Sequence, residues 1–227
     1  MGDVTAAAMS GADRAEAARY ALLRRLAPSI RHNLVINLQP IGMIYEVLDR
    51  RLRSPGPDIA QVHESARKIN NFARAALECC LNVVTWLSPE EGVLTNAVDG
   101  TRECTSLVAT TLSFRGYSLR NNATHVPGDV RLSAMRNVLT AALLQATDER
   151  PPPAELEVTT ARSDGGLQVR LQLRSAEGEA GTDAVRCYRS LVWADVEALA
   201  AAEDTQVSRP AAGEIVITFP WARAAAA

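Results

Sequence analysis

His32 offers the clearest chemistry in the sequence, because it lies in the middle of residues 29–34, a segment with helical periodicity. A neutral imidazole nitrogen is a good nucleophile toward phosphorus, so a histidine displayed on a helix can accept a phosphoryl group and pass it on. His32 is two residues from both Ile30 and Leu34, which puts it about 160° around the helix from these apolar side chains. We therefore predict that His32 projects away from the core that the helix helps to build.

The side chains around His32 have the character of a docking surface for a partner protein. Arg31 can neutralise part of the charge of a phosphoryl group, and Asn33 follows the histidine directly. Apolar groups near a nucleophile suit the helix of a docking protein. The surrounding face comprises Val35, Ile36, Gln39 and Met43, with Arg25 and Ser29 one to two turns earlier.

The helix that carries His32 is expected to span residues 14–53. Pro28 and Pro40 fall inside this range, so we expect a kink or a break at each of them. Asn37 is the only strongly polar member of the apolar seam, and a lone amide in such a seam often fixes the register of a helical bundle. The seam residues alternate three and four apart, and they are Tyr20, Leu23, Ala27, Ile30, Leu34, Asn37, Ile41, Ile44 and Leu48.

A second long helix follows a turn at residues 54–58, where Asp58 is placed to cap it. Its apolar stripe ends before Ser88-Pro89 and consists of Ile59, Val62, Ala66, Ile69, Ala73, Ala76, Cys80, Val83 and Leu87. Two long helices cannot bury both of their seams against each other alone. A four-helix bundle made from two chains solves this problem, so the pattern predicts a homodimer.

The second half of the chain reads as an α/β arrangement. Helices are expected at residues 102–114, 130–147 and 190–202, and a Gly/Glu/Ala-rich loop precedes the last of them. Strands are expected at residues 117–122, 156–160, 167–173 and 214–219; the middle two flank Ser-Asp-Gly-Gly, a good hairpin signal. The predicted order is therefore helix, strand, helix, strand, strand, helix, strand.

Composition narrows the functional classes. The net charge of −2 gives no electrostatic reason to expect nucleic-acid binding. No apolar run approaches the roughly 18 residues that a membrane span needs, and the N-terminus lacks the layout of a signal peptide. The four cysteines show no C-x-x-C spacing and are expected to be small buried hydrophobes in a reducing cytoplasm.

A long helical hairpin with an exposed histidine, followed by this order of elements, resembles the core of a sensor histidine kinase. That core joins a dimerisation and histidine-phosphotransfer bundle to a Bergerat-type ATP-binding domain. The resemblance covers about residues 14–221. It implies an α+β fold in which residues 14–90 form the dimeric hairpin and residues 98–221 form a degenerate α/β sandwich, with tails at 1–13 and 222–227. It also implies that His32 is the phospho-acceptor.

The residues that these kinases use with ATP differ in this chain. The family usually places an acidic base directly after the histidine, where Asn33 stands here. Members that act as phosphatases often carry Thr or Asn four residues after the histidine, and here that residue is Ile36. In the ATP-site helix, the metal-binding Asn of the family falls on Ala141 and a second Asn falls on Gln145. Alanine has no oxygen to offer Mg²⁺, so metal-bridged triphosphate binding should be lost.

The adenine-reading motif of the family is also replaced. Asp-x-Gly-x-Gly would follow the strand ending at Leu173, where the chain instead has a segment that begins at Ser175 and contains only Glu179-x-Gly181 as an echo. About 16 residues separate Leu173 from the next expected helix, which is too few for the usual ATP lid.

Such a chain resembles the dimeric histidine phosphotransferases built on a kinase-like scaffold. The resemblance implies that His32 shuttles a phosphoryl group between receiver aspartates, with response-regulator receivers or a hybrid histidine kinase as partners. It implies no cofactor of the chain's own, since the receiver supplies Mg²⁺. One alternative is a non-catalytic pseudokinase that binds and regulates a response regulator or a kinase. An ATP-dependent kinase with unusual motifs is disfavoured by Ala141.

The other ionisable candidates have simpler explanations. His63 lies beside the seam of the second helix and His125 lies next to a Val-Pro-Gly turn, so both are expected to be structural or solvent-facing. Asp148 and Glu149 have the residue types of a cation site, but a solvated helix end is the expectation.

Overall fold

The computed structural model describes residues 10–88, 92–178, 181 and 189–222. The chain divides into two compact units, one formed by Ala27–Pro89 and the other by the residues on both sides of that segment. Long helices come first, and a five-stranded sheet with helices follows, so the mixed α+β class and the predicted order of elements are confirmed. The tails expected at 1–13 and 222–227 lie largely outside the described residues.

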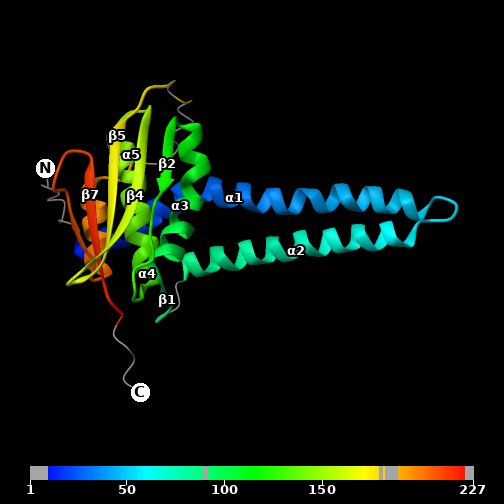
Figure 1. Cartoon of the computed structure of the whole chain (residues 1–227), viewed down its shortest axis with the longest axis horizontal. Helices are drawn as coiled ribbons and strands as arrows, with labels where there is room; N and C mark the ends of the chain where they lie inside the picture. The colour runs from blue at the N-terminus through cyan, green and yellow to red at the C-terminus, as the bar shows by residue number, and fades with distance from the viewer. Residues whose placement is uncertain (1–9, 89–91, 179–180, 182–188, 223–227) are drawn as a thin grey trace, which may run out of the picture. The chain divides into compact units, whose positions relative to one another are not determined.

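Two long helices form the hairpin of the second unit (Figure 1). α1 (Gly11–Leu52) contains both Pro28 and Pro40, and it continues through them without a break. α2 (Ile59–Leu87) begins where the Asp58 carboxylate accepts hydrogen bonds from the backbone N–H groups of Ala60 and Gln61, at 2.9 and 3.4 Å. The predicted cap is therefore confirmed, because these N–H groups have no partner inside the helix.

The hairpin seam on α1 agrees with the pattern from Ile30 onward. Each of its predicted members from Ile30 to Leu48 is partly shielded from solvent. Asn37 does not reach across to α2; its side-chain Nδ2 donates to the carbonyl oxygen of Asn33 in its own helix, at 2.9 Å. The role predicted for Asn37 in setting the register is therefore not supported by its hydrogen bond.

On α2, half of the predicted seam was displaced by one residue. The shielded residues that follow a regular alternation of three and four are Val62, Ser65, Ile69, Phe72, Ala76, Cys79, Val83 and Trp86; Glu64, Ala75 and Thr85 beside them are partly shielded too. The predicted members Ile59, Ala66, Ala73, Cys80 and Leu87 are exposed instead. Both stripes fit the heptad period, and the bulky Phe72 and Trp86 take the inner positions because they bury more apolar area than alanine.

The start of α1, which we define as residues 11–26, belongs to the α/β unit. Its buried side chains are Ala15, Ala18, Ala21, Leu22 and Leu26. Tyr20 was predicted in the hairpin seam but is 61% exposed, and Ala27 is exposed as well. One continuous helix therefore presents one apolar stripe to the α/β unit and, after Leu26, a different one to α2.

The five-stranded sheet has the order β2-β4-β5-β7-β6. Only β2 and β4 run parallel, whereas the other pairs are antiparallel. Alternate residues of β5 are buried, and Gln168, Arg170 and Gln172 lie on the other face, which is the period expected of a sheet covered on one side. The strands are β2 (Tyr117–Asn121), β4 (Ala154–Ser163), β5 (Gly166–Ser175), β6 (Gln206–Ser208) and β7 (Glu214–Pro220).

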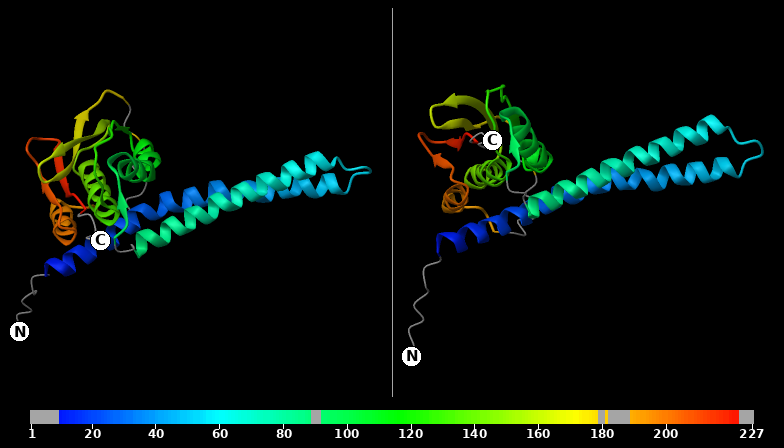
Figure 2. Two further views of the ribbon diagram at one scale, coloured as in Figure 1. Left: turned by 60° about the horizontal axis from the view of Figure 1, so that its bottom comes forward. Right: turned by 90° about the horizontal axis from the view of Figure 1, so that it is seen from below.

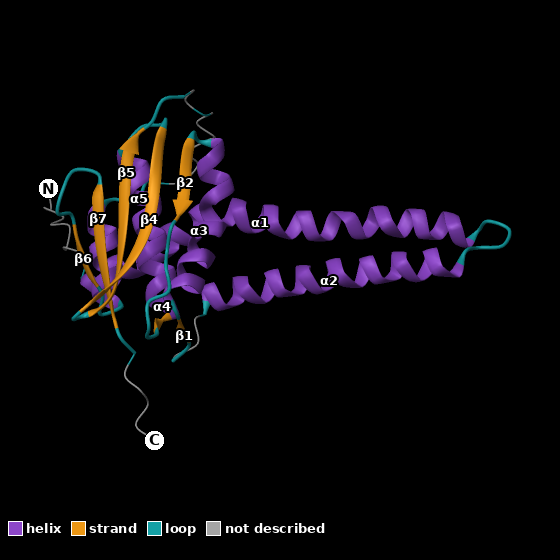
Figure 3. Ribbon diagram, in the orientation of Figure 1, coloured by secondary structure: helices purple, strands orange, loops and turns teal. Residues whose placement is uncertain are grey.

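Helices cover the apolar face of this sheet (Figure 3). They are α3 (Ala97–Phe114), α6 (Trp193–Ala202) and a continuous stretch made of α4 (Leu132–Ala134), the π-helical turn η1 (Met135–Leu139) and α5 (Thr140–Glu149). The helices predicted at 102–114, 130–147 and 190–202 are thus confirmed. The short strands β1 (Leu94–Thr95), β3 (Val130–Arg131) and β6 were missed, because strands this short leave no alternating pattern.

The start of α1 forms a further layer. Both views in Figure 2 show it crossing α5 and α6 on the side away from the sheet. The α/β unit therefore has three layers: the sheet, the helices that cover it, and the first turns of the chain's first helix.

Candidate functional site

His32 is exposed on the outer side of the hairpin. Ile30 and Leu34, each two residues away, are partly shielded in the seam, so the histidine points away from α2. Within the hairpin unit, the imidazole is therefore accessible to a protein that donates or accepts a phosphoryl group.

Six of the residues predicted around His32 are exposed as well: Arg31, Asn33, Val35, Ile36, Gln39 and Met43. Ile36, Gln39 and Met43 lie within about 40° of the histidine around the helix, and Val35 lies about 60° away. Arg31 and Asn33 lie about 100° to either side. Three of these side chains are apolar and strongly exposed: Val35 at 47%, Ile36 at 51% and Met43 at 63%. Apolar groups that one chain leaves in water beside a nucleophile are suited to a docking partner.

Two residues grouped with this face are not available to a phosphoryl group. Arg25 forms two hydrogen bonds with the Asp148 carboxylate, at 2.5 and 2.8 Å, within the α/β unit. Ser29 is buried. Arg31 is thus the cation nearest to His32 along the helix that remains exposed.

A second exposed apolar stripe, which we call the flank, runs along one side of the hairpin. On α1 the side chains of the flank are rotated by about 80° around the helix axis from the centre of the seam. On α2 they are rotated by about 80° to 130° from the centre of its seam, in the same direction along the chain. Because the two helices are antiparallel, an equal sense of rotation brings both stripes to the same side. The flank comprises Leu38, Tyr45 and Leu52 on α1 and Ile59, Ala66, Ala73, Leu77, Cys80, Val84 and Leu87 on α2.

The flank and the histidine face are different sides of α1. Leu38 and Tyr45 lie about 120° to 140° from His32, whereas Met43 lies about 20° from it. A protein bound along the flank would therefore leave the His32 imidazole free.

The positions that correspond to the nucleotide site of the resembled kinases are not assembled into a site. Ala141 and Gln145 are buried on α5, with exposed fractions of 0% and 1%. Ser175 is exposed at the end of β5. Glu179 lies outside the described residues. Ala141 offers no oxygen, and the Oε1 atom of Gln145 is buried without a hydrogen-bond partner among the described residues, so these positions do not fit Mg²⁺.

Asp148 is not the solvated helix end that the sequence suggested. Its carboxylate is only 4% exposed and accepts hydrogen bonds from Arg25, from Arg115 at 3.2 Å and from the backbone N–H of Leu191 at 3.1 Å. A buried carboxylate held by two guanidinium groups and an amide is a structural anchor. It ties the end of α5 to the start of α1 and to the segment before α6.

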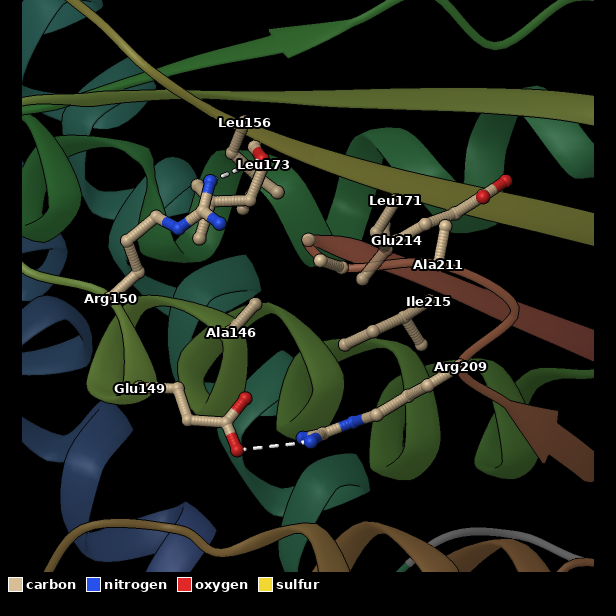
Figure 4. A pocket seen from close by; sticks show the side chains of 12 residues that line it. Ala146, Glu149, Arg150, Leu156, Leu171, Leu173, Arg209, Ala211, Glu214 and Ile215 are labelled. Atoms are coloured by element: carbon tan, nitrogen blue, oxygen red, sulfur yellow. Dashed lines mark hydrogen bonds and ion pairs between the residues drawn. The ribbon is translucent and has the colours of Figure 1, made fainter.

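A cavity of about 520 Å³ lies between the end of α5 and the sheet (Figure 4). Buried leucines and Ile215 form its apolar wall. At the mouth, Arg150 donates to the carbonyl oxygen of Leu173 and Arg209 donates to Glu149, each at 2.9 Å. Both guanidinium groups are thus engaged by the chain itself.

The remaining candidates show no catalytic arrangement. His63 and His125 are exposed. Within the described ranges, no group of three His, Cys, Asp or Glu side chains is arranged to hold a metal ion. No helix in this part of the chain combines the length and the apolar character that crossing a membrane requires. Cys187 lies outside the described residues, and Cys104 is buried while Cys80 is exposed.

The chain is similar to several solved structures, but no match is found by sequence. No family model and no curated protein sequence matches the chain. A bacterial phosphotransferase is similar over 87% of this chain and 95% of its own, with 16% identity and a TM-score of 0.40. The Acinetobacter baumannii histidine kinase AdeS is similar over 84% of this chain and 97% of its own, with 11% identity and a TM-score of 0.41.

A separate catalytic domain is similar to a smaller share of the chain. The catalytic domain of the histidine kinase ThkA is similar over 58% of this chain and 97% of its own, with 8% identity and a TM-score of 0.43. The neighbours are thus a phosphotransferase and histidine kinases, in keeping with the resemblance noted from the sequence. With identities of 8% to 16% and TM-scores of 0.40 to 0.43, this similarity does not by itself assign a function.

Proposed function

We propose that this protein is a histidine phosphotransfer protein of a two-component phosphorelay. His32 takes a phosphoryl group from the aspartyl phosphate of one receiver domain and gives it to the aspartate of another, without using ATP. The observation that supports this most directly is the exposed imidazole of His32, which lies on the outer side of the hairpin among exposed apolar side chains.

The transfer needs little from this chain besides the imidazole. The lone pair of a neutral ring nitrogen attacks phosphorus in line, the N–P bond forms, and the P–O bond to the aspartate breaks. The receiver's carboxylate leaves with the electron pair, and the proton on the imidazolium product is released to solvent. The receiver holds the Mg²⁺ that orients the phosphoryl group, and the docked geometry supplies most of the rate enhancement. Arg31 is placed to offset part of the negative charge.

Three departures favour a receiver rather than ATP as the donor. Asn33 cannot take a proton, so no base stands beside the histidine to support attack on ATP. Ala141 and Gln145 are buried and do not fit a metal-bridged triphosphate. An aspartyl phosphate already has a high transfer potential, and its transfer requires neither feature.

The functional form in this proposal is a homodimer. The flank described above would otherwise expose residues such as Leu77, Leu87 and Tyr45 at 60%, 63% and 60%. A second copy of the same hairpin pairs this stripe with an identical one and completes a four-helix bundle. Both copies of His32 then face outward.

Phosphotransfer from a panel of phosphorylated receiver proteins tests the proposal. The wild-type chain should become labelled by at least one receiver and should return the label to another receiver, whereas His32→Ala should remain unlabelled. His125→Ala serves as the control, because it removes an exposed histidine that belongs to the α/β unit and not to the hairpin. A His32→Ala chain that is still labelled would refute the assignment of His32. Receiver binding without labelling of the wild type would instead favour a non-catalytic pseudokinase.

A further inference from the structure

Two arginines at the start of α1 are paired with two buried acids of the α/β unit. Arg25 holds Asp148 at the end of α5, as described above. Arg19 donates from Nη2 to the Oε1 atom of Glu203, at 3.4 Å, and the Glu203 side chain is only 7% exposed. The arginines are six residues apart, so they span about 9 Å along α1.

Glu203 connects this helix to the beginning of the α5 stretch. Its Oε1 atom also accepts a hydrogen bond from Asn137 at 2.7 Å, and its Oε2 atom accepts one from Ser133 at 3.0 Å. The first arginine is therefore fixed near residue 137 and the second at residue 148. The start of α1 runs beside the helix face that lies between these two points.

The side chains that α1 buries along this line are mostly small. The buried stripe of α1 between and around the arginines contains Ala15, Ala18, Ala21 and Leu22, each at most 6% exposed. Helices approach more closely where the residues at the contact are small. Both views in Figure 2 place this part of α1 against α5 and α6.

The covered face is the one that carries Ala141 and Gln145. Ala141 and Asp148 are seven residues apart, so they lie within about 20° of each other around α5, and Gln145 lies within about 60° of both. This is the face on which the resembled kinases carry the asparagines of their nucleotide site. Both positions are sealed, and the buried Oε1 atom of Gln145 finds no hydrogen-bond partner among the described residues.

We infer that the start of α1 is a built-in cover of this face, held in place by the Arg19–Glu203 and Arg25–Asp148 pairs. The cover excludes small ligands from the nucleotide side of the α/β unit because it occupies that surface. This exclusion does not depend on whether the asparagines are present. The occupant is a segment of the same chain, an amphipathic helix that carries Arg19 and Arg25 beside its buried alanine-rich stripe. The inference goes beyond the proposed function, since it does not require His32 to accept a phosphoryl group.

Thiol accessibility in the full chain tests the cover directly. The thiol introduced by Ala141→Cys replaces only a small buried side chain, and with α1 in place it should react with maleimide at least about 100-fold more slowly than the exposed Cys80, as a fully buried group does. Adding Arg19→Ala and Arg25→Ala should raise its reactivity at least about tenfold, because the two substitutions remove the ion pairs that hold the start of α1 to Glu203 and Asp148. Mass spectrometry assigns the label to each position.

The matched control adds Arg14→Ala and Arg24→Ala to Ala141→Cys, which removes two exposed arginines from the same helix. Circular dichroism verifies that each variant is folded. Rapid maleimide labelling of the Ala141→Cys thiol in a chain with all four arginines would overturn the cover. Equal labelling rates in the Arg19→Ala/Arg25→Ala and Arg14→Ala/Arg24→Ala backgrounds would overturn it too. Hydrogen exchange of α5 in chains that retain Ala141 provides a second readout: faster exchange with Arg19→Ala/Arg25→Ala alone supports the cover, and unchanged exchange contradicts it. Neither readout involves phosphate, so failure here is distinct from failure of phosphotransfer.

Discussion

His32 and Ile30 project from opposite sides of α1. Ile30 is partly shielded in the hairpin seam, and His32, two residues later, is exposed. This relationship follows from helical geometry, since two residues correspond to about 200° of rotation. It assigns the imidazole to the outer side of the hairpin and the apolar side chain to its interior.

Separate substitutions should distinguish the flank from the histidine face. Leu77 and Met43 are similarly exposed, at 60% and 63%, but Leu77 lies on the flank and Met43 beside His32. We expect Leu77→Asp to convert the proposed dimer to a monomer, because a carboxylate would be buried in the bundle core. Met43→Asp should leave the dimer intact. Sedimentation of both variants measures this, and a Leu77→Asp chain that remains fully dimeric would exclude the flank as the interface.

Met43→Asp should instead slow phosphotransfer. The loss of one apolar contact at a docking surface, together with an added charge, commonly costs 1 to 2 kcal/mol, about a tenfold effect. The initial rate of labelling by a phosphorylated receiver measures this, with Lys68→Asp on α2 as the control for added negative charge. An unaltered rate for Met43→Asp would show that receivers do not use this face.

Arg25→Ala should destabilise the fold strongly. The Asp148 carboxylate is 4% exposed and keeps Arg115 and the Leu191 N–H as partners, so losing the charged hydrogen bonds from Arg25 should cost about 2 to 3 kcal/mol. Arg67→Ala breaks the exposed pair with Glu64 and should cost at most about 1 kcal/mol. Urea denaturation measures both effects. Equal losses in the two variants would mean that the Asp148 anchor contributes no more than a surface pair.

The buried thiol of Cys104 should make stability depend on alkaline pH. Burial raises the pKa of Cys104 from the ordinary 9.0 to about 12. Between these values the unfolded chain releases the thiol proton while the folded chain retains it, so stability falls as pH rises, by about 1.4 kcal/mol per pH unit. The difference in unfolding free energy between wild type and Cys104→Ala isolates this contribution. A difference that is constant from pH 8 to pH 11 would contradict it.

Restoring the missing asparagines should not restore nucleotide binding. Ala141→Asn with Gln145→Asn supplies the side chains of the resembled kinases, but the start of α1 still covers that face. We expect no measurable Mg·ATP binding by calorimetry, provided that circular dichroism shows a folded chain. Tight binding by this variant would show that the chemistry of two residues, and not the cover, had excluded the nucleotide.

Helical periodicity predicted the hairpin well because long amphipathic helices leave an unambiguous pattern. The pattern could not decide which of two adjacent stripes on α2 faces inward, since Ala66, Ala73 and Cys80 satisfy the heptad as well as Ser65, Phe72 and Cys79 do. The large side chains of Phe72 and Trp86 were the signal that could have decided it.

The candidate site was predictable only in part. The exposure of His32 followed from its spacing to Ile30, whereas the burial of Arg25 and Asp148 did not follow from any local pattern. These two residues are 123 positions apart, and a contact at that separation depends on the tertiary fold. Nothing in the local sequence around Arg25 or around Asp148 indicates that the two side chains form a pair.

The division of the chain into units has a consequence for the order of folding during synthesis. Residues 27–89 form a compact unit of their own, so the hairpin can form as soon as they have left the ribosome. The start of α1 is made earlier but must wait for Asp148 and Glu203, which lie 123 and 184 residues beyond Arg25 and Arg19. Its alanine-rich stripe stays exposed throughout that interval, so the helix that is synthesised first completes its contacts only after Glu203 has been made.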